Sequence, residues 1–371
     1  GLGTQRWVSG DSNAPDEKTC FSFMDRAILD SGVNLIDTAE QYPIPSGSSG
    51  EGAVESLIGR WMQQRNARDK TIIATKITGG SNVNARNLVG DLEGSLRRLK
   101  TDYVDIYQLH WPARYTPQAN WGQSLQYHSE VEPYYKGVTS FEDTVLAMGQ
   151  LLQQGKIRAW GLCNDNAFGL TSLAETARRL GIPGPVSMQN DFSLLDRRSE
   201  ENGVSEASSP IHLNVGFMGY NTLAGGVLTG KYLESPPPYD LPGLESAAPR
   251  GPRGRHDMSG WGRTLYRYRS GPADIATRQY ALLAQKYGLS LTELSLLWCR
   301  RRSGLTTALV AQTSMKQLDE DLRIFQMKKG LTDELMWEVD RIHMQNRLPI
   351  FSSTRVGRDW AGEGEIGEVI P

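Results

Sequence analysis

Short apolar runs alternate with longer amphipathic runs along almost the whole chain, and this alternation constrains the fold more than any other feature. The short runs have the length and composition of buried strands: residues 2–5, 33–37, 71–76, 103–109, 157–162, 186–189, 215–220 and 306–310. The runs between them space their apolar residues as helices do: residues 16–31, 52–66, 84–99, 141–154, 167–180, 273–287 and 314–325. Alternating strands and helices form parallel sheets, and eight such units predict a closed (β/α)₈ barrel, the TIM-barrel class of α/β fold.

Two stretches interrupt the alternation. Residues 112–140 are irregular and rich in aromatic residues, and residues 232–272 are rich in Pro, Gly and Arg; each follows a predicted strand. Loops in this position lie over the C-terminal face of such a barrel, where active sites are found. We therefore expect residues 1–371 to form a single barrel with two long loop insertions over that face, which act as a lid or cofactor clamp. The alternative is that they are disordered surface insertions.

Composition and charge exclude several classes of partner. The net charge of −2 gives no reason to expect nucleic acid or an anionic membrane, and no apolar run approaches the roughly 20 residues of a transmembrane helix. The three cysteines are too few and too scattered for a disulfide framework or a metal site, so we predict no metal and a reducing compartment. The chain begins at Gly1 without a Met, which leaves two locations open: the cytoplasm, or the interior of an organelle such as a plastid after removal of a leader.

Polar residues stand at the C-terminal ends of three consecutive predicted strands. Asp37 ends the second, Lys76 ends the third and His110 follows the fourth, while Tyr42 lies five residues beyond Asp37. Any one of them alone would more often be a cap, a surface lysine or a packed side chain. Because neighbouring strand ends meet at the mouth of a barrel, we expect the four to lie together. The lysine would lower the pKa of the tyrosine, which could then protonate a carbonyl oxygen, with the histidine orienting that oxygen.

Eight segments, in the same order, resemble the aldo-keto reductases: GLGT (1–4), NLIDTAEQY (34–42), IIATK (72–76), DIYQLHWP (105–112), QQGKIRAWGLCND (153–165), SMQNDFSLLDR (187–197), LAGGVLTGKY (223–232) and SMKQLDEDL (314–322). The segment AEQYPIP (39–45) is most similar to the Tas-like branch, which is related to the β subunits of voltage-gated potassium channels. The resemblance implies an NADPH-dependent reductase of small aldehydes or ketones. It also implies that Asp37, Tyr42, Lys76 and His110 are catalytic and that Tyr42 is the general acid.

The same resemblance assigns residues to the cofactor and the substrate. Asn164 and Gln189 would hold the nicotinamide carboxamide, and Phe192 would stack on the nicotinamide ring. The remaining cofactor contacts implied by the resemblance are Thr4, Leu223, Gly225 and Lys231 around the pyrophosphate, Arg263 as a phosphate clamp, and Thr313, Gln317 and Asp321 at the adenosine. Gln41 and Trp111 would form part of the substrate pocket.

Several residues depart from the pattern of the family. Residues 311–313 read Ala-Gln-Thr where the family tends to have Gly-Ala-Ser or Gly-Ala-Thr, and Asp321 replaces an Asn. The added carboxylate lies where a 2′-phosphate would be bound, although Lys316 could offset it, so NADH stays possible beside NADPH. Cys163 replaces a Ser. These changes keep two alternatives open: a cofactor-binding regulatory subunit with little turnover, and a structural subunit that has lost activity. A protein partner cannot be named from the sequence.

Overall fold

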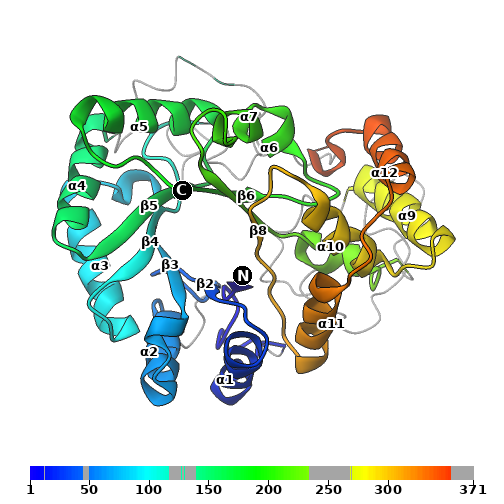
Figure 1. Ribbon diagram of the computed structural model, residues 1–371, viewed down its shortest axis with the longest axis horizontal. Helices are drawn as coiled ribbons and strands as arrows, with labels where there is room; N and C mark the ends of the chain where they lie inside the picture. The colour runs from blue at the N-terminus through cyan, green and yellow to red at the C-terminus, as the bar shows by residue number, and fades with distance from the viewer. Residues whose placement is uncertain are drawn as a thin grey trace, which may run out of the picture.

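The computed structural model describes residues 1–11, 13–44, 50–116, 127, 129, 139–233, 268 and 270–351. In this part of the chain eight parallel strands pair in sequence order, from β1 to β8, in one sheet. A parallel bridge between Leu2 and Val310 joins β1 to the segment after β8, so that the sheet closes on itself. Figure 1 shows the strands around the centre and the helices outside them. The (β/α)₈ class predicted from the sequence is confirmed.

Each strand overlaps a predicted run. The strands are β1 (Leu2–Gly3), β2 (Leu35–Asp37), β3 (Ile72–Ile77), β4 (Val104–Leu109), β5 (Ile157–Cys163), β6 (Ser187–Asp191), β7 (Gly216–Tyr220) and β8 (Thr307–Ala308). The register pairs Lys76 with Gln108 and Cys163 with Gln189 near the C-terminal ends of their strands. This register brings polar side chains from several strands to one end of the barrel.

The helices surround the strands. They are α1 (Glu17–Met24), α2 (Ala53–Arg65), α3 (Ala85–Leu99), α4 (Phe141–Gln153), α5 (Ala167–Leu180), α6 (Arg198–Glu201), α7 (Val204–Ser208), α9 (Gly271–Lys286), α10 (Leu291–Arg301), α11 (Met315–Gln326) and α12 (Asp333–Gln345). The short helical turns are the π-helical η1 (Asp25–Leu29) and the 3₁₀ turns η3 (Arg68–Lys70), η4 (Gly80–Asn82), η7 (Ala224–Thr229) and η11 (Pro349–Phe351).

Side-chain caps fix where several helices begin. Ser140 and Ser314 accept hydrogen bonds from the backbone of α4 and α11, which satisfies amide groups that have no partner within the helix. Helices α6, α7, α10 and α12 were not predicted. The start of α10 had a sequence signal, because Ser290 and Glu293 form a reciprocal capping box, and Thr332 caps α12.

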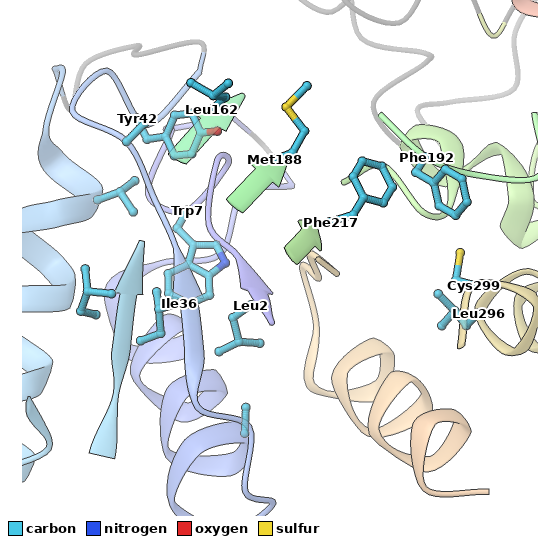
Figure 2. Packing of buried hydrophobic residues seen from close by; sticks show 14 of the residues in the cluster. Leu2, Trp7, Ile36, Tyr42, Leu162, Met188, Phe192, Phe217, Leu296 and Cys299 are labelled. Atoms are coloured by element: carbon cyan, nitrogen blue, oxygen red, sulfur yellow. The ribbon is translucent and has the colours of Figure 1, made fainter. Parts of the chain in front are cut away.

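Apolar side chains fill the space between the strands and the helices. Figure 2 shows Leu2, Trp7 and Ile36 packed together on one side of the barrel, and Phe192 and Phe217 on the side of Cys299. A smaller second cluster contains Leu35, Ala74, Met218 and Leu309, which come from or beside strands distributed around the sheet. Side chains of this kind fill the interior of a closed barrel, so polar groups that need a ligand or solvent are placed at its mouth.

Most of the two predicted insertions, 112–140 and 232–272, lies outside the described residues. Their role as a lid or cofactor clamp therefore stays a prediction. The prediction that residues 1–371 form a single domain is likewise untested. Where the first insertion begins, Arg114 forms a bidentate ion pair with Asp165 after β5, at 2.9 and 2.5 Å. Within the described segments, no helix combines the length and the apolar character needed to cross a membrane.

Candidate active site

A cleft of about 860 Å³ opens at the C-terminal ends of the strands. Its walls include thirteen of the predicted site residues: Thr4, Asp37, Tyr42, His110, Trp111, Asn164, Gln189, Leu223, Gly225, Lys231, Thr313, Gln317 and Asp321. The barrel therefore brings residues from the two ends of the chain to one cavity. Lys76, Gln41 and Phe192 do not line it, and Arg263 lies outside the described residues.

An ion pair lies beneath the cleft. The Nζ atom of Lys76, which is fully buried, lies 2.8 Å from both carboxylate oxygens of Asp37 and 2.9 Å from the carbonyl oxygen of Thr38. Burial alone would lower the pKa of Lys76, but the charge of Asp37 and the proximity of Tyr42 raise it above its ordinary value. The lysine is thus a fixed cation whose three N–H groups all have acceptors.

Tyr42 stands above this pair. The ammonium of Lys76 lies 5.2 Å from the centre of the Tyr42 ring, and the ring meets His110 edge to face, with their centres 5.8 Å apart. Lys76 lowers the pKa of Tyr42 as expected, but it does not bring the pKa below the ordinary value of a tyrosine. Burial raises the pKa of Tyr42 above its ordinary value, and Lys76 opposes this only in part. The phenol therefore keeps its proton at neutral pH and can act as a proton donor.

His110 is held as a neutral ring. Burial and the nearby charge of Lys76 lower its pKa well below the ordinary value. Trp111 stacks on it, with ring centres 6.0 Å apart. Gln41 was predicted to form part of the substrate pocket. The structure instead places it away from the cleft wall, with its amide nitrogen 3.0 Å from Nδ1 of His110. Its side chain reaches the histidine and not the cavity.

Three amide and thiol side chains form the wall between His110 and Asp37. Gln189 donates to Asp37 at 2.7 Å, and the thiol of Cys163 donates to the side-chain amide oxygen of Gln189 at 3.5 Å. Asn164 donates to the carbonyl oxygen of His110 at 3.0 Å. Burial raises the pKa of Cys163 to about 12, so this thiol is neutral. The two amides predicted to hold a nicotinamide thus lie together, and they contact His110 and Asp37.

Phe192 and Tyr220 differ in their relation to the cleft. Phe192 is 1 % exposed and stacks on Trp298 with ring centres 5.1 Å apart, within the hydrophobic core beside Phe217 (Figure 2). It therefore does not offer a face to a cofactor, contrary to the prediction. Tyr220, at the end of β7, does line the cleft, and its hydroxyl donates to Asn164 at 2.5 Å. The rule that identified Asp37, a polar residue at a strand end, would also have found Tyr220.

The other half of the cleft fits a dinucleotide. Gly225 and Gly226 both have positive φ, 63° and 97°, which L side chains adopt only with strain, and Lys231 lies on the same wall. Gln312 also lines the cleft; it is 2 % exposed, and neither atom of its amide has a hydrogen-bond partner among the described residues. A buried amide without partners is costly, so this wall is built to receive a polar ligand. Gln312 was not predicted as a site residue.

At the same end of the cleft, Asp321 lies near the middle of α11. Burial, helped by Glu320, raises its pKa to about 7. Thr313 donates to Gln317 through its backbone nitrogen at 2.8 Å, which orders the turn before the helix. Across the described residues, no group of three or more His, Cys, Asp and Glu side chains is arranged to hold a metal ion.

Comparison with known proteins agrees with this arrangement. The aldo/keto reductase family matches residues 1–343. Protein tas of Escherichia coli (strain K12) and of Shigella flexneri is 31 % identical to the chain over 364 residues, which cover 94 % of this chain and 95 % of that protein. An aldo-keto reductase of Babesia bovis is 33 % identical over 294 residues, or 76 % of this chain and 98 % of the relative. The relation to potassium-channel β subunits stays a prediction. The chain belongs to the aldo/keto reductase family and is an NAD(P)H-dependent oxidoreductase.

Proposed function

We propose that this enzyme reduces a small aldehyde or ketone to an alcohol, with NADPH as the reductant and Tyr42 as the general acid. The observation that carries the proposal is the meeting of Tyr42, His110 and the Lys76–Asp37 pair at one end of the cleft. Bound NADPH would supply a hydride to the carbonyl carbon.

The roles of the four residues follow from their charge states. The phenol of Tyr42 breaks its O–H bond and gives the proton to the carbonyl oxygen as the hydride arrives. The resulting tyrosinate is stabilised by the ammonium of Lys76, which Asp37 holds in place at 2.8 Å. Neutral His110 donates a hydrogen bond to the same oxygen, and Trp111 forms the adjacent wall. Water then returns a proton to Tyr42.

The binding mode of the cofactor rests on the cleft walls. Asn164 and Gln189 present amide groups to the carboxamide, and Tyr220 takes the stacking role that the sequence assigned to Phe192. The backbone at Gly225 and the side chain of Lys231 contact the pyrophosphate, and Gln312 joins Thr313, Gln317 and Asp321 at the adenosine half. NADH is the alternative cofactor, because ionised Asp321 would repel a 2′-phosphate. The proposed substrate is a small carbonyl compound. The cytoplasm and the interior of an organelle both stay open as the compartment of the enzyme, and no protein partner is proposed.

The proposal is tested by isothermal titration with NADPH and with NADH, followed by the loss of NADPH absorbance with a panel of aromatic and aliphatic aldehydes and ketones. We expect the wild type to bind NADPH and to reduce carbonyl compounds. Tyr42→Phe should abolish this reduction and keep an affinity for NADPH within about twofold of the wild-type value. Binding without turnover on any carbonyl would favour a regulatory subunit. Equal turnover by Tyr42→Phe would exclude this tyrosine as the acid, and failure to bind either nucleotide would favour a structural role.

A further inference from the structure

The side chain of Gln41 contacts His110 but does not line the cleft. Gln41 follows β2 in the chain and is half-buried, whereas His110 follows β4 and lines the cleft. The amide nitrogen of Gln41 lies 3.0 Å from Nδ1 of His110. Because an amide nitrogen can only donate, Nδ1 must be the acceptor of this hydrogen bond.

A neutral imidazole carries its proton on one nitrogen only. When one ring nitrogen accepts a hydrogen bond, the proton is on the other, so the partner of Nδ1 determines the state of Nε2. Gln41 does not line the cleft and occupies Nδ1. This leaves Nε2, on the opposite side of the ring, as the nitrogen that can serve a ligand in the cavity.

We propose that Gln41 is a positioning residue that holds His110 as the Nε2–H tautomer, so that this nitrogen donates a hydrogen bond to the oxygen of the carbonyl substrate. The substrate contact rests on the function proposed above; the tautomer does not.

The surroundings of the ring support a fixed tautomer. Burial of His110 and the nearby positive charge of Lys76 both disfavour the doubly protonated ring, so the ring carries a single N–H proton. Trp111 stacks on one face and Tyr42 meets the ring edge to face, so the imidazole has little freedom to turn. A ring that is neutral, packed and bonded at Nδ1 is restricted to one hydrogen-bonding state.

The tautomer can be measured directly by NMR on full-length protein labelled with ¹⁵N-histidine. The chain has five histidines, and His110→Gln assigns the resonance of interest. In the wild type we expect His110 to show an unprotonated Nδ1 and a protonated Nε2. Gln41→Met has a similar volume but cannot donate, and should give a mixture of the two tautomers. Gln41→Glu presents an acceptor and should move the proton to Nδ1.

Kinetics provide the second readout. Gln41→Met should lower kcat/KM for the carbonyl substrate about tenfold, the loss expected for one hydrogen bond, with the dissociation constant of NADPH changed less than about twofold. Gln41→Glu should lower kcat/KM by more than about tenfold. With the proton on Nδ1, the Nε2 atom of His110 is an acceptor and cannot donate to the substrate oxygen. Gln279→Met is the matched control: Gln279 bonds Gln345 between α9 and α12, so both the spectrum and kcat/KM should be unchanged.

A proton on Nδ1 of His110 in the wild type, or an unchanged tautomer in Gln41→Met, would overturn the proposal. So would the expected spectra together with full activity in Gln41→Met and Gln41→Glu, because the tautomer would then not serve the substrate. Absence of carbonyl reduction by the wild type would instead count against the proposed function, because the spectra do not depend on turnover.

Discussion

Gln189 donates a hydrogen bond to Asp37 across the mouth of the barrel, with 2.7 Å between Nε2 and Oδ1. One side chain on the wall of the cleft is therefore bonded to the carboxylate that holds Lys76. The thiol of Cys163 donates to the carbonyl oxygen of the same amide, so the amide nitrogen faces the carboxylate. This wall of the cleft and the Lys76–Asp37 ion pair are parts of one hydrogen-bonded network.

Replacing Gln189 should therefore affect two steps. Gln189→Met keeps the volume and removes the donor to Asp37, so we expect both weaker NADPH binding and a fall in the rate of hydride transfer of about tenfold. Fluorescence titration and single-turnover kinetics measure the two effects separately. Asn164→Ala is the comparison, because Asn164 lies on the same wall and bonds His110, not Asp37. If Gln189→Met changes binding alone, the bond to Asp37 has no role in the reaction.

Lys76→Met should reduce kcat by about a thousandfold or more, because the tyrosinate formed by proton transfer would lose the adjacent cation. It should also destabilise the fold by roughly 3–5 kcal/mol, since Asp37 would be left as a buried charge without its partner. The double variant Asp37→Asn, Lys76→Met removes both charges and should recover much of the stability, measured by urea unfolding, without recovering turnover. A folded, fully active Lys76→Met would show that the lysine is only structural.

Tyr220→Ala and Phe192→Ala should have opposite effects. Tyr220 lines the cleft, so its loss should weaken NADPH binding about tenfold, the value of one aromatic stacking contact, with a small effect on stability. Phe192 packs on Trp298 and Phe217, so its loss should cost about 3–5 kcal/mol of stability and leave cofactor affinity nearly unchanged. Calorimetric titration and thermal unfolding of both variants compare the two roles. A larger loss of affinity in Phe192→Ala would restore the assignment made from the sequence.

Asp321→Asn should change how stability depends on pH. In the unfolded chain an aspartate loses its proton near a pKa of about 3.9, whereas in the folded protein burial raises the pKa of Asp321 to about 7. Between these values the folded state binds more protons, so the free energy of unfolding falls as pH rises. The asparagine side chain does not ionise, so the variant should not lose stability in this way. Near pH 8 it should be more stable than the wild type by on the order of 4 kcal/mol, because the two pKa values differ by about three units at about 1.4 kcal/mol each. Near pH 4 the two should be similar.

The same variant tests the cofactor. Above pH 7 the ionised carboxylate would repel a 2′-phosphate, so Asp321→Asn should tighten NADPH binding more at pH 8 than at pH 6, with a smaller effect on NADH. Asp319→Asn, an exposed neighbour on α11 that pairs with Arg26, serves as the control. Weaker NADPH binding in Asp321→Asn at both pH values would mean that the carboxylate is itself a ligand of the cofactor.

The sequence alone determined the barrel and the end of it at which Asp37, Lys76 and His110 lie, because both follow from local patterns. Short apolar runs such as 103–109, bounded by amphipathic runs, are typical of buried parallel strands, and parallel strands place their C-terminal ends together. Asp37, Lys76 and His110 could therefore be grouped before any coordinates were known. Helix α10 was not predicted, although Ser290 and Glu293 form a capping box at its start; most of its residues are buried, so it exposes only a narrow polar face.

Only the tertiary structure decided which way the side chains point and how deeply they are buried. Phe192 and Tyr220 are both aromatic residues just beyond or at strand ends, yet one packs into the core and the other lines the cleft. Gln41 meets His110 because β2 and β4 end near each other, although 69 residues separate the two in the chain. The pKa of Tyr42 rises, and does not fall, because burial by the surrounding barrel outweighs the charge of Lys76. Side-chain direction and desolvation depend on every element that packs around a residue, and a linear pattern does not contain that information.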